Sequence, residues 1–420
     1  MIEEKIAKIL EKQKQIKKEL KENAISFLEC EESLRNLAGE FEKILQEDTL
    51  TELTEPTQLN KIECKCGSFA KYKDLQTKRL RTGRTDIKIK RRHYFCPKCK
   101  TSYYPLDEKY GLKDIREFSP LMISIMAFLA SKMSYAESQQ TMKEILNIKI
   151  STTAVQNQSE KFGKEILEHK FDYIAAENKD EILRMILLLD GGMIHTGCQE
   201  YKEARLGVVI KYTAKSGINV HKFPACDNAE NFCRDFDIFC RMHGSSACKH
   251  IAVVGDGAAW IDNFQATYYW EAIRIIDYFH AKEYIVKALK EIYGEEWEKQ
   301  TKSDYILGLL ENGEALEIAE ELKKVYLANT KTDEVFKAMR YFEKHWEKMR
   351  YKEYEKQGYP IGSGEVEGGI RNVIHDRMGK SRSTWTICDA NAIMILRAYI
   401  INGYWQFIKQ KRFQMVCKNR

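Results

Sequence analysis

The sequence predicts an α/β protein, and three observations lead to this prediction. Four short apolar runs after residue 181 are typical of central strands in a sheet that is covered on both faces. Long charged segments with helical periodicity lie before, between and after these runs. Only 6 prolines occur in 420 residues, which favours a high helix content. A chain of this length has room for roughly three domains, each with a core of its own.

Composition argues against a disordered, a secreted and a membrane protein. Hydrophobic residues make up 44% of the chain and charged residues 31%, as in folded soluble proteins. The longest apolar stretch, Leu121–Ala130, is far shorter than the ~20 residues of a membrane helix. Charged residues begin at Glu3, which argues against a secretory signal. We therefore expect a cytoplasmic protein with reduced cysteines and no membrane partner.

Residues 1–55 predict an N-terminal helical domain. The apolar positions of its first half are spaced by four, three, seven and four residues, which is the a/d seam of a helix. Two arrangements agree with this seam: a short coiled coil that joins two chains, or an amphipathic helix packed on its own domain. The seam consists of Ile2, Ile6, Ile9, Ile16 and Leu20.

Residues 56–112 predict a small β-rich module of the zinc-ribbon type. A Cys-x-Cys pair and a Cys-x-x-Cys pair bracket it and supply the four thiolates of a tetrahedral zinc site. The first pair has one intervening residue where two are usual, so the alternative is a reduced ribbon held by its strands alone. The expected ligands of a structural Zn²⁺ are Cys64, Cys66, Cys96 and Cys99.

Charge is distributed unevenly along the chain. The formal net charge is +6, but residues 56–132 carry +11, residues 340–420 carry +8 and residues 1–55 carry −5. Two basic blocks point to a polyanion contacted at two places, and the alternative is a pair of solvated lysine-rich faces. A basic ribbon on a metal-pinned scaffold would hold phosphates. The DNA contacts predicted in the ribbon are Arg79, Arg81, Arg84, Lys88, Lys90, Arg91 and Arg92.

Residues 113–175 predict three helices that include a helix-turn-helix. Ser119 caps the first helix ahead of a proline, and Ser134 opens the second with a capping box to Glu137. A short link then leads to a third helix that starts at Ser151. Base or phosphate contacts are expected at the start of this third helix, and the alternative is three ordinary core helices. The predicted contacts are Thr152, Thr153 and Gln156.

Residues 176–420 predict a sheet whose strand ends carry carboxylates. Asp190 and Asp256 each end a buried apolar run beside glycines, which permit close approach of a ligand. Buried carboxylates repel each other unless a cation lies between them, and Mg²⁺ prefers oxygen ligands. A third acid is expected from Glu365 or Glu367 in a glycine-rich segment. These two lie two residues apart, so only one of them can face the metals, and the alternative is a solvated pair.

Asp277 and His280 lie three residues apart at the exit of another predicted strand. Their place beside two candidate metal ligands favours a functional role over a structural histidine. Residues 281–356 contain charged helices without a strand signal, and a last helical block begins near Glu365. By position and residue type, we expect this last block to steady a DNA strand through Arg371, Arg377, Lys380, Arg382 and Trp385.

Four strings of residues resemble the insertion-sequence transposases of the Kra type, which are distant relatives of the Mutator-like transposases. They are Asp190-Gly-Gly-Met, Gly255-Asp-Gly-Ala-Ala-Trp260, Asp277-Tyr-Phe-His280 and Ile361-Gly-Ser-Gly-Glu-Val-Glu367. The resemblance extends over nearly the whole chain, from the cysteine ribbon to the C-terminal helices. It implies an RNase H-like catalytic core with a helical insertion at about residues 283–357.

The resemblance also implies the site residues. An Asp-Asp-Glu triad falls on Asp190, Asp256 and Glu367, because the family's Glu follows Ile-Gly-Ser-Gly-x-Val. The family's Asp/Cys-x-x-His motif falls on Asp277 and His280. The triad would hold two Mg²⁺ (or Mn²⁺) ions, cleave phosphodiester bonds at element ends and join these ends to target DNA.

Double-stranded DNA is the partner that the resemblance implies. Pairing of the two ends of the insertion sequence requires at least two protomers. The expected location of the protein is the nucleoid of a prokaryotic cell. Two alternatives remain at this point: a non-catalytic DNA-binding protein that uses the ribbon and the helix-turn-helix, and an RNase H-like nuclease that cuts without joining. A small-molecule enzyme would leave both basic blocks without a role.

Overall fold

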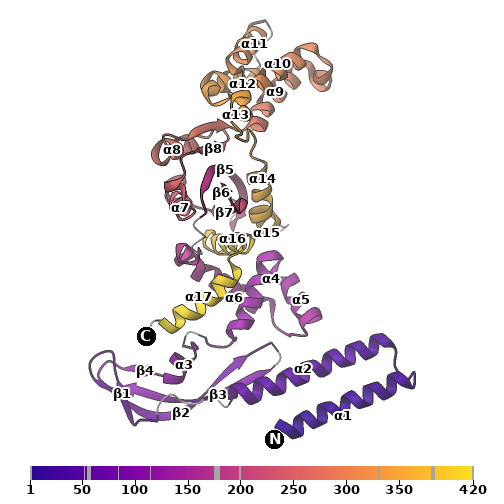
Figure 1. Cartoon of the computed structure of the whole chain (residues 1–420), viewed down its shortest axis with the longest axis vertical. Helices are drawn as coiled ribbons and strands as arrows, with labels where there is room; N and C mark the ends of the chain where they lie inside the picture. Colours follow the sequence, from indigo (N-terminus) through magenta and orange to yellow (C-terminus); the bar gives the residue numbers. More distant parts are fainter. Residues whose placement is uncertain are drawn as a thin grey trace. The chain divides into compact units, whose positions relative to one another are not determined.

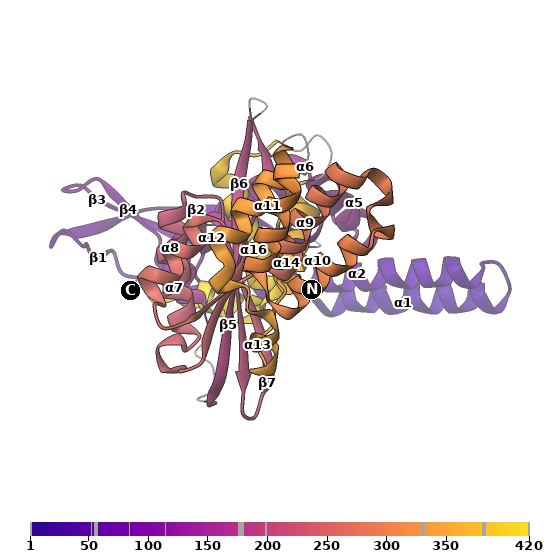
Figure 2. The ribbon, with the colours of Figure 1, turned by 90° about the horizontal axis from the view of Figure 1, so that it is seen from above.

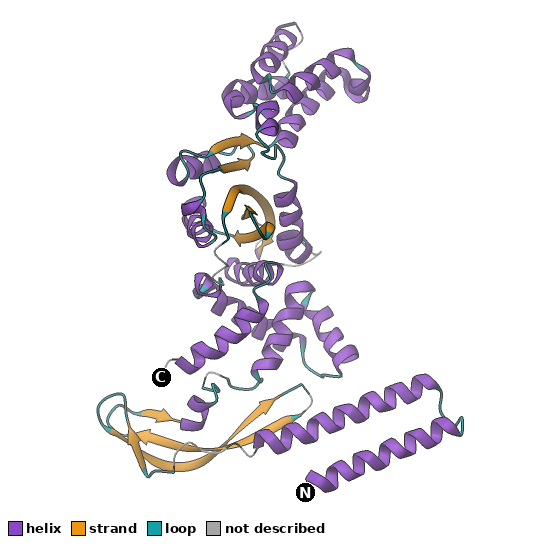
Figure 3. Ribbon diagram, viewed as in Figure 1, coloured by secondary structure: helices purple, strands orange, loops and turns teal. Residues whose placement is uncertain are grey.

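The computed structural model contains two compact units, and each is described by itself (Figure 1). Unit 1 is Met1–Phe162 with Trp405–Arg420, and unit 2 is Gly163–Tyr404. Helices and two separate sheets make up the chain, which confirms the α/β class (Figure 3). The structure describes residues 2–51, 53, 58–83, 85–113, 115–174, 180–197, 200–328, 332–379 and 384–418, without the side chains of 51 and 412–418.

Unit 1 begins with an antiparallel helical hairpin. Helix α1 (Ile2–Lys21) and helix α2 (Phe27–Thr51) lie side by side in both views (Figures 1 and 2). Ion pairs cross between them from Lys12 to Glu40 at 2.5 Å and from Lys5 to Glu47 at 3.6 Å. The predicted apolar seam of α1 is half-buried along this hairpin, so the seam packs within the chain.

A four-stranded antiparallel sheet follows in the order β1-β2-β3-β4. Its strands are β1 (Lys61–Glu63), β2 (Phe69–Arg81), β3 (Asp86–Cys96) and β4 (Thr101–Tyr103). Near the turn between β2 and β3, the buried Leu80, Ile87 and Ile89 alternate with the exposed Arg79, Lys88 and Lys90, because successive residues point to opposite faces. The buried face packs on helix α3 (Pro105–Lys109) through Leu80, Ile87, Ile89, Leu106 and Leu112.

Three helices then occupy the predicted places. Helix α4 (Pro120–Lys132) is capped by Ser119, and helix α5 (Tyr135–Leu146) by the predicted capping box of Ser134 and Glu137. Helix α6 (Thr152–Glu168) follows a turn in which Asn147 adopts a left-handed conformation. The C-terminal helix α17 (Trp405–Lys418) belongs to this unit, because the Trp405 ring packs on Phe128 and Phe162.

Unit 2 contains a five-stranded mixed sheet in the order β7-β6-β5-β8-β9. Strands β5 (Ile182–Thr196), β6 (Glu200–Thr213) and β7 (Gly217–Ala225) form an antiparallel meander. Strands β8 (Ile251–Gly255) and β9 (Ile273–Ile276) run parallel to β5. Helix α7 (Ala229–Met242) leads into β8, and helix α8 (Ala259–Tyr268) leads into β9.

Two details of this sheet differ from the sequence prediction. Strand β7 was not predicted, because its sequence mixes polar residues with Pro224, as edge strands do. Asp190 lies inside β5 rather than at its end, because β6 continues to pair with β5 as far as Thr196.

Helices cover both faces of the sheet (Figure 1). On one face α7 approaches so closely that a Cβ at Gly207 of β6 would overlap the ring of Phe236. On the other face a Cβ at Gly192 of β5 would lie 3.0 Å from both Ile370 and His375. This second face carries α14 (Gly364–Gly369), a π-helical turn (Ile370–His375), α15 (Asp376–Met378) and α16 (Ile387–Ile401).

A helical block lies between β9 and α14, as predicted from residues 281–356. It consists of α9 (Tyr278–Tyr293), α10 (Thr301–Asn312), α11 (Ala315–Ala328), α12 (Asp333–His345) and α13 (Tyr351–Lys356). Helix α12 returns onto α9, where the rings of Tyr284 and Tyr341 stack at 4.0 Å. Short 3-10 turns lie at Lys170–Tyr173, Ser245–Ala247, Gly294–Lys299 and Trp346–Lys348.

Among the residues that the structure describes, no helix combines the length and the apolar character needed to cross a bilayer.

Candidate metal centre

The register of the central strands brings two predicted carboxylates together. Leu189 of β5 pairs with Gly255 of β8, so the next residue on each strand, Asp190 and Asp256, stands at the same level. Neighbouring strands lie about 4.8 Å apart, so the two side chains are direct neighbours. Each carboxylate accepts one backbone N–H: Asp190 from Gly191 at 2.7 Å, and Asp256 from Ala258 at 2.9 Å.

Strand alternation decides which face Asp190 uses. Residues two apart on a strand point to the same face, so Asp190 shares the face of Gly192. That face is covered by the π-helical turn that follows α14. The carboxylate of Asp190 therefore points toward the helix that carries the predicted third acid.

Glu367 of α14 faces this position. One oxygen of its carboxylate, one ring nitrogen of His280 and one carboxylate oxygen of Asp277 all lie within 4.8 Å of one another. Glu365, two residues earlier on α14, is exposed like Glu367 but does not belong to this cluster. The geometry thus agrees with Glu367 rather than Glu365 as the third acid.

Asp277 connects the elements of the site. It is fully buried and caps α9, where its Oδ1 accepts from the backbone N–H of His280 at 2.8 Å. Its Oδ2 accepts from the backbone N–H of Ser363, which leads into α14. The hydrogen bond from His280 to Asp277 comes from the histidine backbone. Asp277 is therefore a positioning residue that ties β9, α9 and the Glu367 segment together.

Electrostatics at Asp190 favour a bound cation. Burial, together with the charges of Asp256 and Glu367, raises the pKa of Asp190 to about 6. The hydrogen bond from Gly191 and the nearby His280 act in the opposite direction. A cation between these oxygens would remove the repulsion, and Mg²⁺ or Mn²⁺ prefers such oxygen ligands. Asp190 and Asp256 carry oxygens of the kind that a hard divalent ion prefers, whereas the ligand atoms that lie within 4.8 Å of one another belong to Asp277, His280 and Glu367.

A cleft opens directly on this centre. Its volume is about 580 Å³, and Asp256 and His280 lie in one wall. The opposite wall is α12, with three basic side chains that sequence reasoning missed: Lys337, Arg340 and Lys344. The signal was present in the sequence, because three basic residues spaced by three and four share one helix face.

The four predicted zinc ligands also converge. Their Sγ atoms all lie within 4.8 Å of one another, with Cys64 to Cys99 at 3.4 Å and Cys66 to Cys96 at 3.7 Å. Tetrahedral Zn–S bonds of about 2.3 Å place sulfurs about 3.8 Å apart, so the cluster has nearly the size of a zinc site. The backbone N–H of Cys66 and the hydroxyl of Tyr103 lower the pKa of Cys64 to about 6, which favours a thiolate.

Comparison with known proteins places the chain in a family. A family model described as an uncharacterised protein family, UPF0236, matches residues 20–413. This chain belongs to the UPF0236 family. A curated relative, "UPF0236 protein in vanSb 3′ region" from Streptococcus gallolyticus, is 21% identical over 333 residues. That match covers 75% of this chain and 71% of the relative. The UPF0236 match includes the cysteine cluster, the strand-end carboxylates and Glu367.

The UPF0236 chain carries a basic strip on its ribbon. Arg79 and Lys88 are cross-strand partners on the exposed face of the β2–β3 hairpin, and Lys90 follows on the same face. Arg92 lies over the ring of Tyr72 at 4.0 Å. Arg79, Lys88 and Lys90 are exposed on one surface, and Arg92 lies half-buried beside them.

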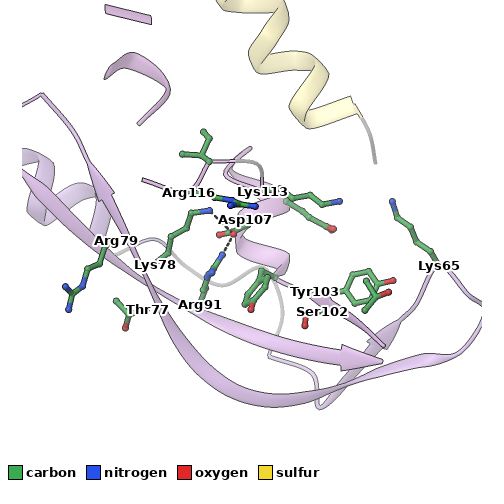
Figure 4. A pocket seen from close by; sticks show the side chains of 14 residues that line it. Lys65, Thr77, Lys78, Arg79, Arg91, Ser102, Tyr103, Asp107, Lys113 and Arg116 are labelled. Atoms are coloured by element: carbon green, nitrogen blue, oxygen red, sulfur yellow. Dashed lines mark hydrogen bonds and ion pairs between the residues drawn. The ribbon is translucent and has the colours of Figure 1, made fainter. Parts of the chain in front are cut away.

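Two other predicted contacts of the ribbon serve its packing. Arg91 and Lys78 both bind the buried carboxylate of Asp107 (Figure 4). Arg81 pairs with Glu117 and donates to the carbonyl of Lys149 at 3.0 Å. Around Asp107 lies a cavity of about 700 Å³ whose exposed basic residues, which sequence reasoning also missed, are Lys65, Lys113 and Arg116 (Figure 4).

The remaining predicted contacts of unit 1 lie on α6. Thr152 and Thr153 are exposed in its first turn. Gln156 is half-buried and donates to the carboxylate of Glu160 at 3.0 Å. Only the two threonines are therefore fully presented to solvent.

The predicted contacts of the last helical block fall into two groups. Arg371 is exposed beside Asp376. Arg377 and Trp385 are buried, 2% and 6% exposed, with the guanidinium 4.8 Å from the ring centroid. The backbone N–H of Trp385 also donates to His195 of β5, so these two residues belong to the core of unit 2. Three further predicted contacts, Arg84, Lys380 and Arg382, lie outside the described residues.

Proposed function

We propose that this chain is a DNA transposase that cleaves phosphodiester bonds and transfers the new ends with a divalent metal. One observation carries the proposal: Asp190 and Asp256 follow paired residues of two parallel strands, and the charges of Asp256 and of Glu367 on α14 both act on Asp190. The strand order β7-β6-β5-β8-β9, with β6 antiparallel to its neighbours, supports an RNase H-like core. The long helical block between β9 and α14 supports the insertion expected for such a transposase.

The residues of the site would divide the work as follows. Asp190, Asp256 and Glu367 would hold Mg²⁺ or Mn²⁺, which lowers the pKa of bound water and stabilises charge on the scissile phosphate. Asp277 keeps the start of α9 and the Ser363 segment together, so that Glu367 stays at the strand ends. His280 lies in the cleft wall, within reach of a phosphate beside the carboxylates.

Unit 1 would supply DNA binding. The basic strip of the ribbon, with the exposed Arg79, Lys88 and Lys90 and the half-buried Arg92, suits the phosphates of a duplex. A structural Zn²⁺ on the four-cysteine cluster would hold the ends of this ribbon. The helices α4–α6 would act as a helix-turn-helix. A DNA substrate of this kind places the protein at the nucleoid.

Two copies of the chain are needed to hold the two ends of an insertion sequence. Helix α2 offers a surface through which two copies could contact each other. Leu34, Phe41 and Leu45 are all exposed, and their spacing of seven and four puts them on one helix face. An apolar stripe of this kind suits a second copy of the same hairpin.

The test is cleavage of DNA that contains the sequences flanking this reading frame. The full chain should cut it with Mg²⁺ or Mn²⁺, and Asp190→Asn, Asp256→Asn and Glu367→Gln should each abolish cutting while the fold survives. Glu365→Gln is the matched control and should cut nearly as wild type. An Asp256→Asn protein that still cuts would refute the triad, and a dead Glu365→Gln beside a live Glu367→Gln would move the third acid.

Strand transfer separates the proposal from a simple nuclease. Pre-cut ends should be joined to a target duplex by the wild-type chain. Cutting without joining would identify an RNase H-like nuclease instead. DNA binding with neither activity would identify a non-catalytic DNA-binding protein.

A further inference from the structure

The cleft beside the carboxylates has a second wall that the triad does not explain. One wall is the strand-end side with Asp256 and His280, and the other is the helical block. The helical block lines the cleft with Tyr284, Phe336, Lys337, Arg340, Tyr341, Lys344 and His345. All but Tyr284 come from the single helix α12.

Helix α12 packs directly on the loop of the second Asp. A Cβ at Gly257 would lie 2.7 Å from the Tyr341 ring and 3.0 Å from Nε2 of His345. The wall and the loop of Asp256 therefore keep a fixed spacing, because only glycine leaves room for this contact. The position of α12 relative to the candidate metal ligands is thus set by packing.

Two buried polar atoms in this wall have no hydrogen-bond partner among the described residues. His345 is 2% exposed, and its Nδ1 has no hydrogen-bond partner among the described residues. The same holds for the hydroxyl of Tyr341. Leaving a buried polar atom unpaired costs roughly 1–3 kcal/mol, so a polar ligand or water in the cleft would stabilise the wall.

Three cations run along the open part of the wall. Lys337, Arg340 and Lys344 are exposed and share one face of α12. Lys337 and Lys344 lie seven residues apart, or about 10 Å along the helix, so the three cations can contact more than one phosphate of the same strand.

Two of these cations already have partners on the same helix. Lys337 contacts Glu334 at 2.6 Å, and Arg340 contacts Glu343 at 2.8 Å. Such surface pairs contribute about 0–1 kcal/mol, so phosphates can replace them.

We propose that α12 binds the sugar-phosphate backbone of a single DNA strand and holds it against the cleft wall that carries Asp256 and His280. The inference rests on the proposed function and specifies its substrate as an unpaired strand at the site of cleavage. The cleft, of about 580 Å³, has the size of a small-ligand pocket, which suits one strand rather than a duplex. The exposed ring of Phe336 offers a base a surface for stacking.

Lysine footprinting of the full chain tests this without any need for catalysis. The protein is treated with an amine-reactive reagent in EDTA, with and without a short single-stranded oligonucleotide, and the sites are read by mass spectrometry. Lys337 and Lys344 should lose reactivity several-fold when the strand is present. Lys323 of α11, exposed in the same helical block but outside the cleft lining, should not. Equal reactivity of Lys337 and Lys344 in both samples would overturn the proposal.

A blunt duplex and a charge-reversed variant complete the test. The duplex should protect Lys337 and Lys344 less than the single strand, and equal protection would overturn the single-strand assignment. The variant Lys337→Glu/Arg340→Glu/Lys344→Glu should lose affinity for the single strand, while Lys323→Glu keeps it. An unchanged affinity in the triple variant would contradict the inference.

The outcomes separate this inference from the proposed function. Protection in a wild-type chain that never cleaves DNA with Mg²⁺ would leave the strand-binding wall standing and refute the transposase. Cleavage by a chain whose Lys337 and Lys344 stay fully reactive would support the transposase and refute the strand-binding wall.

Discussion

Two buried carboxylates of the metal centre have opposite effects on folding. Asp277 accepts two backbone N–H groups and joins three elements, so its burial is compensated by hydrogen bonds. Asp190 is desolvated beside two other acids, and its pKa rises to about 6. One residue stabilises the unit, and the other costs stability until a cation is bound. This difference is measurable in the metal-free protein.

Asp190→Asn should stabilise the metal-free chain at neutral pH. The folded pKa of about 6 exceeds the ordinary value of 3.8 for an aspartate, so the charged form is disfavoured in the folded state. The cost is absent below pH 3.8, grows between pH 3.8 and about 6, and is complete above pH 6. We expect a gain of roughly 1–3 kcal/mol at pH 7.5, measured by urea unfolding in EDTA. The gain should shrink toward pH 4.5, and a variant no more stable than wild type at pH 7.5 would contradict this.

Asp277→Ala should destabilise the folded chain. It removes the cap of α9 and leaves the Ser363 N–H without its acceptor, a loss of about 2–4 kcal/mol in the free energy of unfolding. Glu365→Ala, on the neighbouring exposed helix turn, should change stability by less than about 0.5 kcal/mol. Thermal unfolding followed by circular dichroism compares the two, and an Asp277→Ala protein as stable as wild type would rule out the positioning role.

At the scale of elements, the cysteine ribbon is the most self-contained prediction. Four sulfurs from two turns lie at nearly the spacing of a tetrahedral site, although the first pair has one intervening residue. The purified chain should carry about one zinc ion, released by a mercurial reagent and measured with a chromogenic chelator. Cys96→Ser should lose the zinc, whereas Cys388→Ser, an exposed cysteine of unit 2, should keep it. A wild-type chain without zinc would leave a ribbon held by its strands.

The helical hairpin resolves an ambiguity that its sequence left open. The α1 seam is half-buried on α2, so packing within the chain accounts for it. The exposed stripe on α2 is a separate feature, which the seam analysis did not identify because it lies in the second helix. Replacing Leu34, Phe41 and Leu45 by Ser should shift the chain toward monomer in light scattering. Leu28→Ser, exposed on the same helix but outside the stripe, should not; identical masses for all variants would exclude the stripe as an interface.

At the scale of the whole molecule, local patterns predicted the elements and missed what long-range packing decides. Serine caps, strand runs and the four cysteines are local signals, and the structure agrees with them. Glu367 lies 111 residues after Asp256, so its place came from family resemblance and not from periodicity. Arg377 and Trp385 have the residue types of DNA contacts, but they fill the core against β5. Whether a helix residue is buried depends on the element that packs against the helix, and the sequence of the helix alone does not show which element that is.

The salt dependence of DNA binding depends on the whole molecule, because every phosphate contact adds to one slope. The logarithm of the affinity should fall linearly with the logarithm of salt concentration, by about 0.9 per neutralised phosphate. Arg79→Gln, Lys88→Gln and Lys90→Gln together should lower that slope by about 3, since all three are exposed on the ribbon. Lys14→Gln on α1 is exposed and should leave the slope unchanged. Fluorescence anisotropy over a salt series measures both, and a triple variant with the wild-type slope would show that the ribbon does not contact the backbone of DNA.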